Sequence, residues 1–138
     1  MRVLIVEDEA LIAWMLADSL EGAGHEVIGP AATMAEALAL CEVEAPTPEL
    51  AVLDIDLRDG SNGVNVARAL FNRGRVLSIF ASGRTVEARQ ARGFALGLIR
   101  KPYGVDTVLR SVELARDVRS GRTPRHVPAG LELFSAAN

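Results

Sequence analysis

The sequence has few of the residues that build disulfide scaffolds, zinc sites or membrane spans. A single cysteine among 138 residues excludes an internal disulfide and any zinc site made of several cysteines. No apolar run approaches the ~20 residues that a membrane-spanning helix needs, and Glu7 interrupts the N-terminal apolar run before a signal-type stretch forms. The net charge of −3 gives no general attraction to nucleic acid or to an anionic membrane. We therefore expect a cytoplasmic protein with neither kind of partner.

Hydrophobic residues, in contrast, make up 49% of the chain, which is too many for an intrinsically disordered protein. Five short apolar runs predict buried strands, at residues 3–6, 26–28, 50–53, 76–80 and 96–99. Longer segments with helical spacing lie between them and end at glycine or proline. This alternation predicts a doubly wound α/β fold, in which helices cover both faces of a five-stranded parallel sheet.

The predicted helices differ in how many apolar residues they can pack against the sheet. The first, over about 10–21, places Trp14 opposite its apolar stripe, and the second places Cys41 and Ala45 on its inner face. The fourth, over 85–93, has one large apolar residue, so we expect it to be weakly held. Its arginines are expected to form a solvated face; they are Arg84, Arg89 and Arg92. We expect one domain at 1–118 and a flexible tail at 119–138 without an output domain, although Leu131–Phe134 could dock.

Polar side chains follow four of the predicted strands at their carboxyl ends, where open parallel sheets bind ligands. They are Glu7, Asp8 and Glu9 after the first strand, Asp54 and Asp56 after the third, Ser82 after the fourth and Lys101 after the fifth. Carboxylate ligands suit Mg²⁺, which also takes waters and phosphate oxygens. A carboxylate can also act as a nucleophile and form an aspartyl phosphate, whose oxygens need positive charge and hydrogen-bond donors. The pattern favours phosphoryl transfer to Asp54.

Each of these residues also has an ordinary structural interpretation. Glu7 to Glu9 could complement the dipole of the following helix, Ser82 could belong to a turn, and Lys101 could be a surface lysine. Their joint placement at strand ends is what favours a site. Neither His25 nor His126 has a cluster of histidine, cysteine and carboxylate side chains beside it, so we do not expect either to bind a metal.

Residues 1 to about 118 resemble the receiver domain of two-component response regulators. The matching motifs are VLIVEDE at 3–9, VLDIDL at 52–57, Ser82, and KPY at 101–103, and their spacing agrees with the family. FASG at 80–83 is similar to the signature of the FATGUY receivers, which are typically stand-alone regulators. The resemblance implies a flavodoxin-like (CheY-like) three-layer sandwich with strand order 2-1-3-4-5, two helices on one face and three on the other.

The resemblance also implies a role for each site residue. Asp54 would be the phosphoacceptor, and Ser82 the switch hydroxyl. Lys101 would contact the phosphoryl group. Glu7, Asp8 and Asp54, with the backbone carbonyl of Asp56, would hold Mg²⁺. Leu98 stands where many receivers carry a switch tyrosine or phenylalanine, so we expect any switch to act through Ser82 and the fourth helix.

We therefore predict a single-domain response regulator, not an enzyme, that accepts a phosphoryl group from a histidine kinase or phosphotransfer protein. It would signal through an unidentified downstream protein, as a monomer or as a weak dimer through the fourth and fifth helices. Asp56 and Arg84 are expected to pair across the mouth of the site and shield the phosphoryl group, and Trp14 to anchor the kinase. The alternatives are a phosphorylation-independent adaptor with the receiver fold, or a haloacid-dehalogenase-like phosphatase, suggested by the Asp-x-Asp pattern at 54–56.

Overall fold

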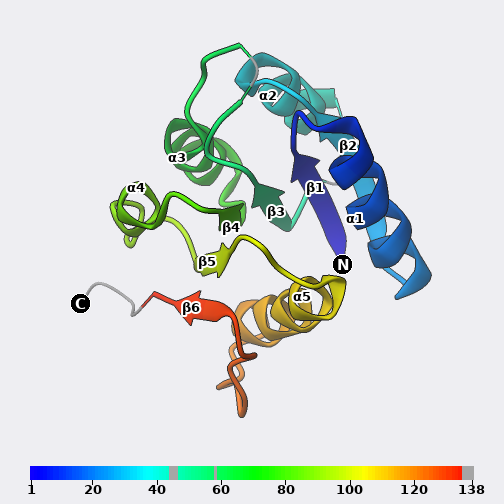
Figure 1. The fold of residues 1–138 in the computed structure, drawn as a ribbon, viewed down its shortest axis with the longest axis vertical. Coiled ribbons are helices and arrows are strands. Elements are labelled where there is room, and N and C mark those ends of the chain that lie inside the picture. The colour runs from blue at the N-terminus through cyan, green and yellow to red at the C-terminus, as the bar shows by residue number, and fades with distance from the viewer. Residues whose placement is uncertain (44–46, 58, 135–138) are drawn as a thin grey trace.

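A computed structural model describes residues 1–43, 47–57 and 59–134, which form alternating strands and helices (Figure 1). The elements are β1 (Arg2–Val6), α1 (Ala10–Gly22), β2 (Glu26–Ala31), α2 (Met34–Val43), β3 (Leu50–Leu53), α3 (Gly63–Gly74), β4 (Leu77–Ser82), α4 (Thr85–Arg89), β5 (Gly97–Arg100), α5 (Val105–Arg119) and β6 (Leu131–Leu133). Among the described residues, no helix has the length and apolar character needed to cross a membrane. The predicted α/β fold class is confirmed.

The strands form one sheet in the order β2-β1-β3-β4-β5-β6. The pairings among β1 to β5 are parallel, as predicted, and their order is the expected 2-1-3-4-5. β6 pairs antiparallel with β5 and extends the sheet by one strand. Because β1, β3, β4 and β5 are parallel neighbours, their carboxyl ends lie along one edge of the sheet.

The core consists of two clusters, one on each face of the sheet. Leu4 and Val6 of β1 pack with residues of α2, α3 and α4, whereas Val3 and Ile5 pack with residues of α1 and α5. Alternate residues of one strand therefore serve opposite faces, which is why the buried strands are apolar throughout. Two helices, α1 and α5, thus cover one face of the sheet and three, α2, α3 and α4, cover the other, as expected.

Several elements differ in extent from the predictions. β2 continues to Ala31, and β4 continues to Ser82. α4 ends at Arg89 rather than near residue 93, and turns follow it. Cys41 is half-buried against the core rather than fully buried. Ala45, predicted to lie on the inner face of the second helix, is outside the described residues.

The C-terminal segment departs in part from the predicted flexible tail. Residues 131–133 form β6, so the alternative that Leu131–Phe134 docks holds for that part of 119–138. Leu131 and Phe134 are each 7% exposed and belong to opposite core clusters. The segment around β6 is therefore part of the folded sheet.

Candidate functional site

The carboxyl ends of β1 and β3 bring three acidic side chains together. Asp54 follows β3 directly, and its backbone N–H donates to the carbonyl of Val6 at 2.9 Å. Glu7 and Asp8 follow β1, the neighbouring strand. One carboxylate oxygen from each of Glu7, Asp8 and Asp54 lies within 4.8 Å of the others. The predicted convergence of these residues is thus present in the fold.

The acidic cluster is largely shielded from solvent. Glu7 is 4% exposed and Asp54 is 8% exposed. Burial, helped by the nearby Asp54 and Asp8 carboxylates, raises the pKa of Glu7 to about 7. The three carboxylates repel one another and lose contact with water at this distance. Together they form the set of oxygen ligands that a hard divalent cation takes. The chemistry of the site therefore fits Mg²⁺.

Lys101 provides positive charge to the acidic cluster. Its Nζ lies 3.2 Å from Oδ2 of Asp54, while Oδ1 of Asp54 accepts the N–H of Ile55 at 2.7 Å. Burial alone would lower the pKa of Lys101. The hydrogen bond to Asp54 and the charge of that carboxylate together outweigh burial, so the pKa of Lys101 lies above its ordinary value. Lys101 is the only lysine of the sequence. It stays charged beside Asp54 at neutral pH.

Ser82 lies at the end of β4, between the Lys101 segment and the start of α4. Its carbonyl accepts the N–H of Lys101 at 3.2 Å, and its hydroxyl oxygen accepts the N–H of Arg84 at 3.1 Å. The side chain is buried. The Ser82 hydroxyl thus accepts a hydrogen bond from the backbone of Arg84, the residue that precedes α4.

Asp56 and Arg84 pair as the sequence predicted. Arg84 Nη1 lies 2.8 Å from Oδ1 of Asp56, and Nη2 lies 3.0 Å from Oε1 of Glu87. The Asp56 carboxylate is therefore held in an ion pair at the mouth of the site. Of the arginines assigned to a solvated face, Arg89 is also paired, with Glu132.

The sequence analysis assigned no role to two residues near the site, although its KPY motif at 101–103 contains one of them. Gly63 opens α3, and a Cβ placed there would lie 2.2 Å from the carbonyl oxygen of Asp54. Its position directly after Asn62, which caps α3, was the available signal. The Tyr103 hydroxyl is buried and has no hydrogen-bond partner among the described residues, and burial raises its pKa.

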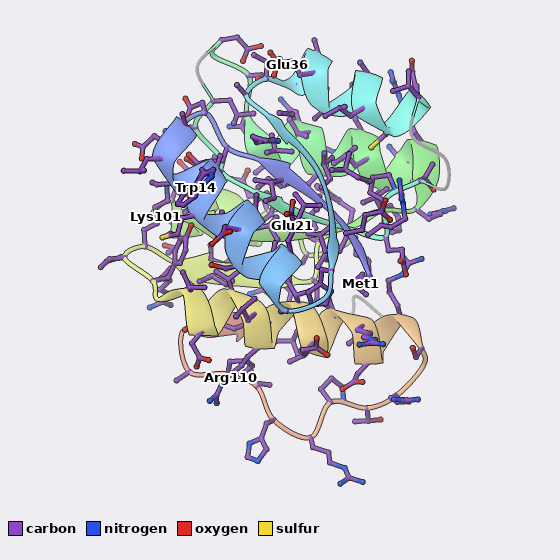
Figure 2. The ribbon with its side chains drawn as sticks, turned by 90° about the vertical axis from the view of Figure 1, so that its right-hand side faces the viewer. Met1, Trp14, Glu21, Glu36, Lys101 and Arg110 are labelled. Carbon is purple, nitrogen blue, oxygen red and sulfur yellow. The ribbon has the colours of Figure 1, made fainter. Side chains whose placement is uncertain are left out.

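The remaining candidates occupy the expected environments. Leu98 is fully buried in the core. Trp14 is 65% exposed and Leu11 is 79% exposed, and Figure 2 shows Trp14 on the outer face of α1. His25 is buried, with Nε2 at 3.2 Å from Glu113.

This fold and site define the class of the protein. The family model described as "Response regulator receiver domain" matches residues 3–113, so the chain belongs to the response regulator receiver domain family. Such domains are parts of two-component systems, and the family typically binds Mg²⁺ at an acidic pocket. The predicted resemblance is confirmed at the level of the receiver domain.

Individual relatives agree with this assignment. The chain is 34% identical over 117 residues to the transcriptional regulatory protein PdtaR of Mycobacterium tuberculosis, covering 83% of this chain and 56% of PdtaR. It is 44% identical over 79 residues to the phyllosphere-induced regulator PhyR of Methylorubrum extorquens, covering 57% of this chain and 29% of PhyR. The solution structure of the PhyR receiver domain of Erythrobacter litoralis has a TM-score of 0.76 and 31% identity, covering 91% and 95% of the two chains. The chain thus spans about half of PdtaR and less of PhyR.

Proposed function

We propose that this receiver accepts a phosphoryl group on Asp54 from the phosphohistidine of a kinase or phosphotransfer protein, and then signals by binding another protein. The observation that carries the proposal is the 3.2 Å contact between Lys101 Nζ and Asp54 inside a cluster of three carboxylates. A buried carboxylate surrounded by acids needs such a cation, and the same cation can neutralise a phosphoryl group. The protein acts here as a phosphoacceptor that assists its own modification, not as an enzyme with turnover.

The proposed step is an in-line displacement at phosphorus. A carboxylate oxygen of Asp54 forms the new P–O bond while the P–N bond to the donor imidazole breaks, and the imidazole leaves with a proton from solvent. Lys101 stabilises the transferred oxygens. Ser82 would exchange its hydrogen bond from Arg84 for one to a phosphoryl oxygen.

Glu7, Asp8 and Asp54, with the carbonyl of Asp56, would hold Mg²⁺. When bound, the ion supplies positive charge to the phosphoryl oxygens as the transfer proceeds. Lys101 contacts Oδ2 of Asp54, so its charge compensates the cluster on that side. Glu7 and Asp8, which follow β1, therefore need Mg²⁺ as a second cation.

The metal requirement is tested by incubating the protein with acetyl phosphate, with Mg²⁺ or with excess EDTA. We expect a phosphoryl mass gain with Mg²⁺ and little or none with EDTA. Equal gains in both would overturn the metal assignment. A phosphorylation-independent adaptor, in contrast, would bind its partner equally well as the natural chain and as Asp54→Ala.

A further inference from the structure

β6 occupies the edge of β5, the last parallel strand of the sheet (Figure 1). Their antiparallel register pairs Gly97 with Leu133, Leu98 with Glu132 and Ile99 with Leu131. The N–H of Phe134 continues the pattern by donating to the carbonyl of Leu96 at 2.9 Å. The edge of β5 is thus a place where an extended segment adds to the sheet by main-chain hydrogen bonds.

One carboxylate ties β6 to two other elements. Glu132 accepts hydrogen bonds of 2.7 Å from both Nε and Nη2 of Arg89, at the end of α4. It also accepts one of 3.1 Å from Arg100, the last residue of β5. These hydrogen bonds, above all those from Arg89, lower the pKa of Glu132 to about 2. Two guanidinium groups therefore form a receptor for one acidic side chain beside the β5 edge.

Gly97 shows that the β5 edge is shaped for a closely packed strand. A Cβ at this position would lie 2.5 Å from the carbonyl oxygen of Glu132 and 3.2 Å from a methyl group of Leu131. The three nearest atoms all belong to β6. Glycine at this position permits the close approach of a strand backbone.

The segment that leads to β6 is tied to β5 and α5 near its C-terminal end by two long hydrogen bonds, from the N–H of Arg100 to the carbonyl of Gly130 at 3.4 Å and from the hydroxyl of Thr107 to the carbonyl of Ala129 at 3.5 Å. Residues 120–130 contain no helix or strand, and Gly121 and Gly130 have positive φ. A groove of about 1110 Å³ separates part of this segment from α5, and Figure 2 shows the segment running back along that helix. A three-residue strand on such a tether is held by its own contacts, so it can open without unfolding the sheet.

We propose that the β5 edge is the docking site for an extended segment of a partner protein, and that β6 is its displaceable occupant in cis. The partner segment carries an acidic side chain that binds Arg89 and Arg100. It also carries apolar side chains that face the two opposite sides of the sheet. Leu131 and Phe134 show where such apolar groups are buried. While β6 is in place, its high effective concentration excludes the partner. This inference does not depend on phosphorylation.

The probe is a labelled peptide with the sequence of residues 128–134, titrated against the full chain. Glu132→Gln in the protein weakens β6 but leaves Arg89 and Arg100 free to take the peptide's own glutamate. We expect this variant to bind the peptide about tenfold more tightly than the natural chain, the effect of losing about 1.4 kcal/mol of charged hydrogen bonding in cis. A peptide with glutamine in place of its glutamate should bind the variant more weakly. Asp106→Asn, a charge change on the outer face of α5, is the matched control.

A second variant separates docking from folding. Gly97→Ala obstructs the β5 edge for β6 and for the peptide alike, so it should bind no peptide, and the amides of 131–134 should exchange hydrogen fast. Glu132→Gln should also speed exchange at 131–134 but leave β1 to β4 protected. Unchanged exchange in both variants, or equal peptide binding by Glu132→Gln and the natural chain, would overturn the proposal. Neither result bears on phosphorylation of Asp54.

Discussion

The guanidinium of Arg84 bridges two segments at the mouth of the acidic site, with 2.8 Å to Asp56 and 3.0 Å to Glu87. Asp56 belongs to the loop after β3, and Glu87 belongs to α4. The backbone N–H of the same arginine donates to the hydroxyl of Ser82. One residue thus connects the loop that carries the phosphoacceptor candidate, the candidate switch hydroxyl and the short helix beside them.

Arg84→Ala is expected to shorten the lifetime of the aspartyl phosphate several-fold. Without the pair, the Asp56 side opens and water reaches the phosphorus more easily. The loss is measured as the decay of the phosphoryl mass after acetyl phosphate is removed. Arg92→Ala, at another exposed arginine, is the control. Both ion-pair partners are at least half exposed, so the variant should fold as stably as the natural chain. A lifetime equal to or longer than that of the natural chain would refute the shielding role.

Gly63→Ala is expected to destabilise the fold by about 2 kcal/mol or more, because the added methyl group meets the backbone of Asp54 and Ile55. Gly74→Ala is the matched control at the other end of α3, where the nearest atom lies at an ordinary 3.5 Å. The control should be neutral or slightly stabilising. Urea unfolding of both variants gives the comparison. Equal stability of the two variants would show that the segment between β3 and α3 can move enough to accommodate the added methyl group.

The buried His25 should make stability pH-dependent. Burial lowers its pKa below the ordinary 6.5, so the unfolded chain binds a proton that the folded chain refuses. Stability from this group is therefore present above pH 6.5 and is lost as the pH falls from 6.5 toward the folded pKa. The N-terminal amine, Glu113 and Arg116 also act on His25.

The test compares urea unfolding of the natural chain and of His25→Gln at pH 8 and at pH 5.5. We expect the natural chain to lose more stability than the variant over this interval. Taking the difference between the two proteins removes the contributions of the other titrating groups, which they share. An identical pH dependence would show that folding leaves the pKa of His25 unchanged, contrary to the account.

Trp14→Ala is expected to leave the fold and acetyl phosphate phosphorylation unchanged, since the side chain is 65% exposed on α1. Transfer from a phosphohistidine donor protein should slow, because a large exposed aromatic side chain is a typical anchor for a partner. Val43→Ala, at an equally exposed apolar residue on α2, controls for the general loss of surface hydrophobicity. Unchanged transfer rates would exclude Trp14 from the kinase interface.

Much of the fold and site could be predicted because their signals are local. An apolar run ending in Asp54 predicts both a buried strand and a polar group at its carboxyl end, and parallel pairing then brings Glu7 and Asp8 beside it. The pairing of Asp56 with Arg84 followed from positions just beyond two neighbouring strands.

β6 could not be predicted in the same way. Its three residues follow a segment rich in glycine, proline and arginine, and the contacts that hold Glu132 come from Arg89, 43 residues earlier. The length of α4 was missed as well, since the N–H groups of Gln90 and Ala91 donate to carbonyls three residues earlier and the chain continues as turns. The contacts of β6 are set by the assembled sheet and not by local periodicity.

The most direct test of the central claim is intact-mass spectrometry after incubation with Mg²⁺ and acetyl phosphate, comparing the natural chain with Asp54→Asn. Asp18→Asn, at an exposed carboxylate of α1, is the matched control. The account predicts a gain of one phosphoryl group in the natural chain and in Asp18→Asn, and none in Asp54→Asn. A gain that persists in Asp54→Asn, or no gain in any of the three, would contradict it.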